Sequence, residues 1–242
     1  MTSAAPESVT SPARIAWGLP DALLCWMAGY LGAIVASGLV FALVRTSELN
    51  AKLLFGVLLP AQQFTVILAL FYVSHLKGQR SLAADFGFVI RLRDAKALVV
   101  GATLEIVLTL ALMPILQLDP DAKHQQLLTD LEEHRDIGTV VLFCIGAVIL
   151  APVVEELLFR GILLRALLRK VQPATAVLVS SMIFALVHLV GDPNTVPFLP
   201  ALAGLGAVLA VVALRSGNLS TSIFIHAGFN LTTTIFFLTF GS

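Results

Sequence analysis

Two adjacent glutamates inside a long apolar run are the residues of this sequence best placed to do acid–base chemistry. They are Glu155 and Glu156, in the string APVVEELLFRG that begins at residue 151. Successive residues of an α-helix point about 100° apart, so the two carboxylates are expected to face different partners. Glu156 and Arg160 share a helix face at i and i+4 and are expected to pair. This pairing leaves Glu155 as a charge without a partner, which at membrane depth points to a function.

A histidine on the following apolar segment is expected to lie at the same depth as Glu155. Glu155 precedes Gln172 by 17 residues, and His188 follows Gln172 by 16 residues. In an antiparallel helical hairpin that turns near residues 171–173, equal distances from the turn bring the two side chains to one level. Phe184 lies one helical turn before His188 and is expected to pack under its ring.

The last apolar segment carries two more polar side chains, on a single face. His226 and Asn230 are four residues apart, and Gly228 between them permits a close neighbour. Both side chains can donate hydrogen bonds. An asparagine donor aimed at a developing oxyanion stabilises acyl-transfer intermediates.

The composition requires that these residues be positioned inside a membrane. Of 242 residues, 58% are hydrophobic and 12% are charged, against about 25% charged in soluble domains. The mean hydropathy is +0.94. The net charge is zero, which argues against nucleic acid as a partner. The sequence therefore predicts a multi-pass integral membrane protein whose first partner is the lipid bilayer.

Runs of about 20 apolar residues, the length that crosses a bilayer, predict an all-α membrane helix bundle. We expect seven transmembrane helices, or eight if the long fourth segment divides at Pro152, which marks a kink. A short interfacial helix is expected within residues 80–96. The expected spans are roughly 22–44, 52–74, 97–118, 137–169, 174–190, 197–214 and 219–240.

The basic residues predict the orientation of the bundle. With seven spans, one side carries eleven Lys and Arg residues, mainly at 77–96 and 160–170, and the other side carries four. The positive-inside rule makes the first side cytoplasmic. The short loops favour a bacterial cell membrane over the endoplasmic reticulum.

Three motifs in order, E-E-x-x-x-R, F-x-x-x-H and H-x-x-x-N, resemble those of the CPBP family, the CAAX proteases and bacteriocin-processing proteins also called the Abi family. The resemblance covers roughly residues 137–240. It implies an intramembrane endopeptidase similar to type II CAAX prenyl endopeptidases, acting on a peptide or a lipidated protein. The expected organisation is a cytoplasmic tail at 1–21, transmembrane helices and an interfacial segment at 22–136, and a catalytic core at 137–242.

The resemblance also implies a role for each polar residue. Glu155 would be the general base, and His188 would help it to activate water. His226 and Asn230 would hold the oxyanion of the tetrahedral intermediate. The supporting residues would be Glu156, Arg160 and Phe184.

Zinc is the alternative to this mechanism, which needs no cofactor. Glu155, His188 and His226 could form a His₂Glu ligand set with an open position for water. The sequence has no H-E-x-x-H motif, and a ligating Glu155 would require a separate base. The mechanism without a metal is therefore favoured.

Other functions remain open at this point. A catalytically silent member of the family could be a bacteriocin-immunity or scaffold protein, and a small transporter could use the same polar cluster. The four proposed catalytic residues could also form a structural network, and the Glu156–Arg160 pair could serve only to stabilise a helix. Glu105, in the third expected span, is interpreted as a core hydrogen-bonding residue.

Overall fold

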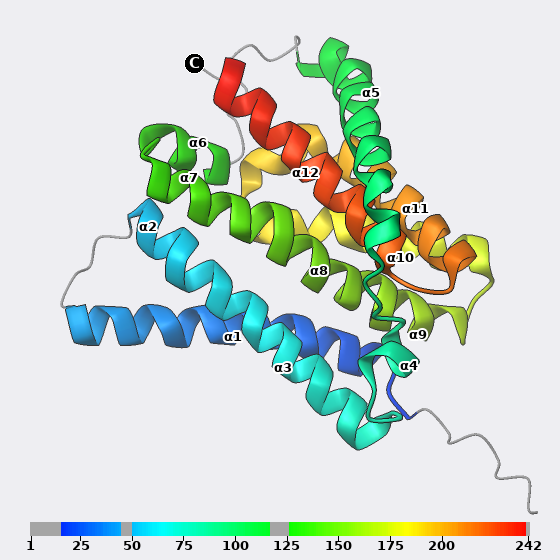
Figure 1. Ribbon diagram of the computed structural model, residues 1–242. Coiled ribbons are helices and arrows are strands. Elements are labelled where there is room, and N and C mark those ends of the chain that lie inside the picture. Colours follow the sequence, from blue (N-terminus) through cyan, green and yellow to red (C-terminus); the bar gives the residue numbers. More distant parts are fainter. Residues whose placement is uncertain (1–15, 45–49, 117–125, 241–242) are drawn as a thin grey trace, which may run out of the picture.

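The computed structural model describes residues 16–44, 50–116 and 126–240, and their regular elements are all helices (Figure 1). Seven of these helices are long and apolar enough to cross a membrane. The fourth does not divide at Pro152, so the prediction of an all-α bundle with seven spans is confirmed. The spans are Leu19–Leu43, Ala51–Lys77, Leu92–Pro114, Ile137–Leu168, Pro173–Val190, Pro193–Ser216 and Ser220–Phe240.

The N-terminal half supplies three of the spans. The elements are α1 (Leu19–Val44), a continuous helix of α2 (Ala51–Leu53), η1 (Leu54–Leu58) and α3 (Leu59–Lys77), then α4 (Leu82–Phe86), η2 (Leu92–Ala97) and α5 (Leu98–Leu116). Residues 80–96 therefore hold two short helical pieces rather than the single interfacial helix expected.

The C-terminal half supplies the other four spans. A short helix, α6 (Gln126–Glu133), precedes the long fourth span, which comprises α7 (Ile137–Cys144), η3 (Ile145–Leu150), α8 (Ala151–Glu155), η4 (Glu156–Leu163) and α9 (Leu164–Leu168). The chain then forms α10 (Pro173–Gly191), η5 (Pro193–Phe198), α11 (Leu199–Ser216) and α12 (Ser220–Phe240).

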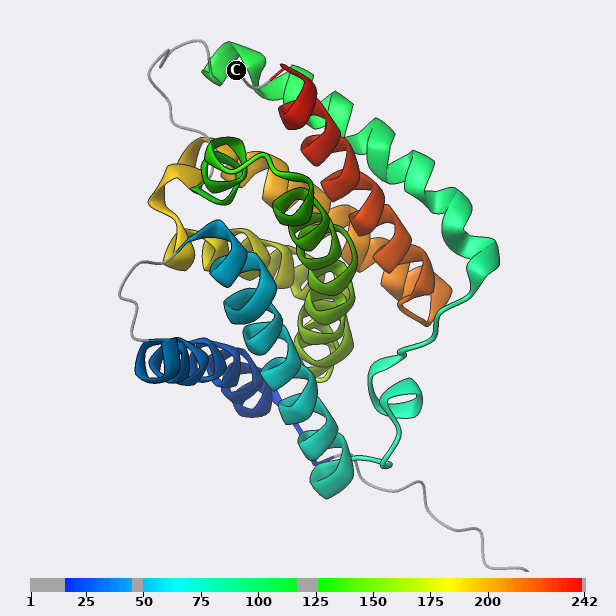
Figure 2. The same ribbon diagram turned by 60° about the vertical axis from the view of Figure 1, so that its left-hand side comes forward.

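The long fourth span lies in the middle of the bundle. Both views show it between α3 on one side and α12 on the other, with α5 alongside α12 and α1 alongside α3 (Figures 1 and 2). Helices α10 and α11 pack against each other as a pair. The central helix carries Glu155 and Glu156, so the neighbouring helices can reach these carboxylates from different directions.

The central helix changes its winding around Pro152 instead of breaking there. Residues 145–150 and 156–163 are π-helical, and the Ala151 N–H donates to the carbonyl of Gly146, five residues back. Proline has no N–H and its ring crowds the carbonyl four residues earlier. A wider turn accommodates that crowding, and π-turns are frequent at functional sites. The same pairing of a π-turn with a proline occurs at Pro60, after residues 54–58.

The start of the central helix is held by an N-cap. The Asp136 carboxylate accepts hydrogen bonds from the Gly138 and Thr139 backbone N–H groups and from the Thr139 hydroxyl. The hydroxyl bond, with the Lys52 ammonium 3.3 Å away, lowers the pKa of this carboxyl from its ordinary value. Such caps satisfy N–H groups that have no partner within the helix.

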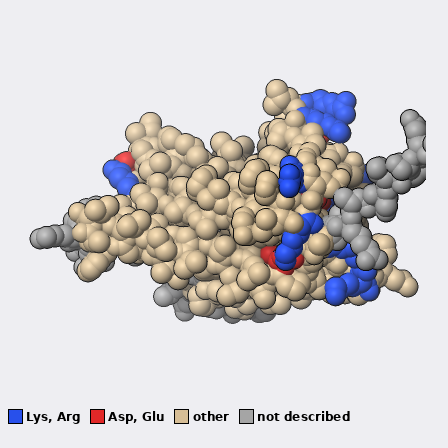
Figure 3. Space-filling model, turned by 90° about the horizontal axis from the view of Figure 1, so that it is seen from below, with Lys and Arg blue, Asp and Glu red and all other residues tan. Residues whose placement is uncertain are grey.

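A buried aspartate organises the end of the bundle where the basic residues gather. Asp85 is 1% exposed and accepts hydrogen bonds from the Ser74 hydroxyl, at 2.6 Å, and from the Gln79 backbone N–H. Figure 3 shows Lys and Arg atoms gathered towards one end of the face that it displays. Anchoring of this kind keeps the 78–97 connection against the bundle; its cytoplasmic location remains a prediction.

The segment before α1 is also held in place. The Trp17 carbonyl accepts a hydrogen bond from Arg169, whose guanidinium lies 4.2 Å from the centre of the indole ring. Helix α1 begins at Leu19, so the expected tail of residues 1–21 includes residues that are packed. Residues 1–15 of that tail lie outside the described part of the chain.

Glycines allow α5 and α12 to cross with their backbones in contact. A Cβ at Gly101 would lie 1.9 Å from the Ile225 carbonyl oxygen, and one at Gly228 would lie 2.2 Å from the Leu98 carbonyl oxygen. The expectation that Gly228 permits a close neighbour is therefore confirmed. Small residues at such crossings are how membrane helices pack without a hydrophobic driving force.

Replacing Gly101 by alanine is therefore expected to destabilise the protein by about 1–3 kcal/mol, because the two helices must separate to admit a methyl group. Unfolding in detergent, followed by circular dichroism, measures the loss. Gly38→Ala is the matched control, since a Cβ there meets nothing within 4 Å and alanine favours a helix. Equal stability of the two variants would contradict the close crossing.

Candidate active site

A buried ion pair forms the base of the site. Arg160 Nη1 lies 2.7 Å from Glu156 Oε1, and the two side chains are 1% and 0% exposed. The other guanidinium nitrogen, Nη2, donates to the Gly206 carbonyl on α11 at 3.1 Å. The guanidinium also lies 4.4 Å from the centre of the Phe184 ring. The predicted pairing is confirmed, and it joins the central helix to α10 and α11.

His226 lies between the two glutamates, which corrects the prediction that they face different partners. Its Nδ1 is 3.2 Å from Glu156 Oε1, and its Nε2 is 3.7 Å from Glu155 Oε2. Because the two ring nitrogens point in different directions, one imidazole from α12 contacts two side chains that diverge from the central helix. The 100° between successive helical residues fixes where each carboxylate points, but it does not prevent one neighbouring ring from contacting both.

Glu155 is the less constrained of the two carboxylates. Its side chain is 22% exposed. Its Oε2 is buried and makes no hydrogen bond with the residues that the structure describes, since 3.7 Å to His226 exceeds hydrogen-bonding distance. Glu156 Oε2 is also buried without a hydrogen bond from these residues, but its side chain is 0% exposed and is paired with Arg160. Buried polar atoms normally have a partner, and the exceptions call for an explanation. A carboxylate in this condition can accept a proton from a bound water molecule.

The orientation of His188 leaves one ring nitrogen available. Its Nδ1 lies 2.7 Å from the Phe184 carbonyl oxygen. A carbonyl oxygen can only accept a hydrogen bond, so Nδ1 carries the hydrogen, and in the neutral ring Nε2 keeps its lone pair. The ring also packs edge-on against Phe184, with 5.0 Å between centroids. The predicted packing of Phe184 under His188 is confirmed.

Phe184 brings the two histidines together around one aromatic ring. The His226 ring lies 5.7 Å from it, and the Phe159 ring lies 5.1 Å from it. The Phe184 ring is 0% exposed, so it shields the neighbouring polar groups from water on that side. In a setting of low dielectric, the electrostatic interactions among those groups are stronger than in water.

Asn230 is committed to a contact that the sequence did not predict. Its Nδ2 donates to the Ala147 carbonyl, in the π-turn of the central helix, at 2.7 Å. His226 and Asn230 thus both contact the central helix, as expected of one helix face. Nothing about the residue type of Ala147 predicts this contact. Pro152 could have predicted it, because its missing N–H leaves a nearby backbone carbonyl without a donor.

The residues of the zinc alternative are not arranged as a ligand set. Among the described residues, no group of three or more His, Cys, Asp or Glu side chains is placed to hold a metal ion. Glu155 and His226 are neighbours, but His188 does not join them in such a group.

Glu105 belongs to the packing of α5 against α12. Its Oε1 lies 3.0 Å from the Thr109 hydroxyl and 3.5 Å from the Thr233 hydroxyl on α12. The interpretation of Glu105 as a core hydrogen-bonding residue is confirmed.

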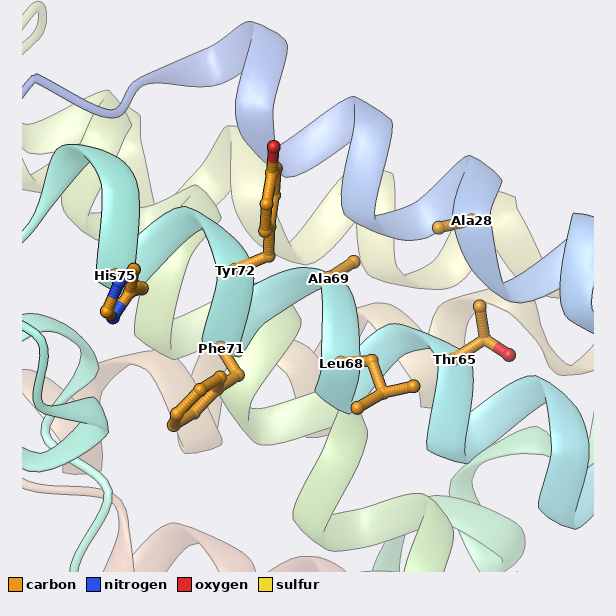
Figure 4. Close-up of a pocket in the computed structure, with 7 residues that line it drawn as sticks. All are labelled: Ala28, Thr65, Leu68, Ala69, Phe71, Tyr72 and His75. Atoms are coloured by element: carbon orange, nitrogen blue, oxygen red, sulfur yellow. The ribbon is translucent and has the colours of Figure 1, made fainter.

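A groove of about 570 Å³ lies between α1 and α3 (Figure 4). It is lined mostly by apolar side chains, and Phe71 and Tyr72 are 56% and 64% exposed. None of the polar residues described above lines it, so the groove is not a candidate for the chemistry.

The fold and the polar cluster define a multi-pass membrane protein with a carboxylate–histidine site buried between its C-terminal helices. Residues 137–232 match the family model described as Type II CAAX prenyl endopeptidase Rce1-like. This segment is a domain of the Rce1-like type II CAAX prenyl endopeptidase family, the CPBP family. No match was found among curated proteins or among solved structures. The domain lies within the expected catalytic core at 137–242 and contains every predicted site residue.

Proposed function

We propose that this protein is an intramembrane endopeptidase that hydrolyses a peptide bond at the membrane. The observation that carries the proposal is the Glu155 carboxylate, which is 22% exposed, has a buried Oε2 that accepts no hydrogen bond from the described residues, and lies 3.7 Å from His226. It lies in a domain whose family is typically made up of peptidases, which implies a peptide substrate.

In the proposed reaction Glu155 removes a proton from a water molecule, whose oxygen attacks the scissile carbonyl carbon. The available Nε2 of His188 accepts the second hydrogen of that water in a hydrogen bond and so orients it. The carbonyl oxygen becomes an oxyanion as the new C–O bond forms. Collapse of the intermediate breaks the C–N bond, and Glu155 returns its proton to the leaving amine.

The oxyanion would be held from α12. His226 would donate a hydrogen bond through Nε2, the ring nitrogen that lies 3.7 Å from Glu155 Oε2. The Asn230 amide has two hydrogens. One is used at Ala147, and the other is the proposed second donor. Glu156, Arg160 and Phe184 would hold these groups in place.

The test is cleavage by the purified, detergent-solubilised protein. A prenylated CAAX peptide and a panel of leader peptides are incubated with wild type and with Glu155→Ala, with and without a strong chelator, and products are identified by mass spectrometry. We expect cleavage that survives the chelator and disappears in the variant. Loss with the chelator would favour a metal site, and a folded wild type that cleaves no peptide would favour the immunity or scaffold function.

A further inference from the structure

The central helix contains, eight residues before Glu155, a backbone carbonyl that has lost both of its usual donors. In an α-helix the Ala147 carbonyl would accept from the Ala151 N–H, but that group donates to Gly146 instead. In a π-helix the donor would be residue 152, which is a proline and has no N–H. A carbonyl left in this state inside a membrane costs free energy, because no water is available to satisfy it.

Asn230 supplies the missing donor from another helix. Its Nδ2 lies 2.7 Å from the Ala147 oxygen, a short distance for an N–H···O bond. One turn earlier on α12, His226 contacts the carboxylates of Glu155 and Glu156. The same face of α12 therefore holds the central helix at two points, one on each side of Pro152.

We propose that Asn230 is a positioning residue for Glu155: by capping the carbonyl that the π-turn and Pro152 leave without a donor, it holds the π-turn that leads directly into α8, the helical segment that carries Glu155. This role is separate from oxyanion binding, because it uses the other hydrogen of the same amide. The catalytic consequence rests on the proposed function, whereas the capping itself does not.

A double-mutant cycle separates the capping role from any other. Pro152→Ala restores a backbone N–H, so the helix can satisfy Ala147 by itself in either the α or the π pairing. Asn230→Ala is expected to lower the Tm of the full-length protein in detergent by several degrees in the wild-type background. In the Pro152→Ala background it is expected to lower the Tm by less than half as much. Equal losses in the two backgrounds would overturn the proposal.

Thr232→Val is the matched control on the same helix. The Thr232 hydroxyl donates within α12, to the Gly228 carbonyl, so its removal deletes a hydrogen bond without touching the central helix. Its effect on Tm is expected to be the same with proline or alanine at position 152. If the Tm loss caused by Thr232→Val also became smaller in the Pro152→Ala background, the assignment of the Asn230 effect to Ala147 would be overturned.

Kinetics test the positioning of Glu155. Asn230→Ala is expected to reduce kcat while changing KM less than threefold, because the substrate contacts remain and the base is displaced. The reduction in kcat is expected to be at least tenfold smaller in the Pro152→Ala background, where only the oxyanion contribution is lost. An undiminished reduction would overturn the positioning role. If the wild type cleaves no peptide, the proposed function fails. The double-mutant cycle in Tm still tests whether Asn230 caps the Ala147 carbonyl, because it does not depend on activity.

Discussion

Glu155→Gln is expected to lower kcat for peptide cleavage by about 10²–10⁴-fold, the usual contribution of a general base. Glutamine has the same shape as glutamate but cannot take a proton from water. The protein should remain folded, since Glu155 Oε2 makes no hydrogen bond with the described residues and the side chain is 22% exposed. Single-turnover cleavage, with Tm measured on the same preparation, checks both statements.

The control for this variant is Glu133→Gln, which removes an exposed carboxylate from α6. It lies on another helix from the site and should leave kcat within twofold of wild type. A Glu155→Gln protein that retains most of its activity would show that Glu155 is not the base. If the Glu155→Gln protein lost both its activity and its fold, the role of Glu155 would be structural rather than catalytic.

Breaking the buried ion pair is expected to have the largest effect on stability. Arg160→Met leaves Glu156 as an uncompensated charge that is 0% exposed, and losses of about 3–5 kcal/mol are typical of such changes. The variant also loses the hydrogen bond to Gly206 and the contact with Phe184. The free energy of unfolding in detergent, measured by denaturant titration, gives the loss.

Removing both charges should recover most of that stability. In the double variant Glu156→Gln with Arg160→Met no net charge remains buried, and neutral replacements of buried pairs are often tolerated. An exposed pair gives the comparison: Lys52 and Asp136 are 3.3 Å apart and 61% and 50% exposed, so Lys52→Gln should change stability little. A double variant no more stable than Arg160→Met would show that packing, not charge, dominates at this position.

The helices and their order follow from local features of the sequence. A span in lipid must satisfy its own backbone hydrogen bonds, so an apolar run of sufficient length becomes a helix whatever surrounds it. The seven predicted spans agree with those of the structure for this reason. The Glu156–Arg160 pair was predictable on the same basis, since both residues are on one helix a turn apart.

The contacts between helices could not be read in the same way. Residues 71 and 83 positions apart, Glu155 with His226 and Ala147 with Asn230, meet because α12 lies along the central helix. The motifs indicated that His226 and Asn230 share a face, but not what that face contacts. Pro152 predicted an irregularity in the long helix, and the structure shows its form, which is a π-helical segment on each side of the proline.

The sequence by itself therefore determined an all-helical membrane protein with seven spans, one intrahelical ion pair and a set of polar residues suited to hydrolysis. Hydropathy and i,i+4 spacing are properties of a single helix, so they can be interpreted without knowing which helices lie beside it. The tertiary structure alone decided that one imidazole contacts both glutamates and that Asn230 caps a backbone carbonyl. Both contacts depend on the packing of α12 along the central helix, whose turns are widened on both sides of Pro152.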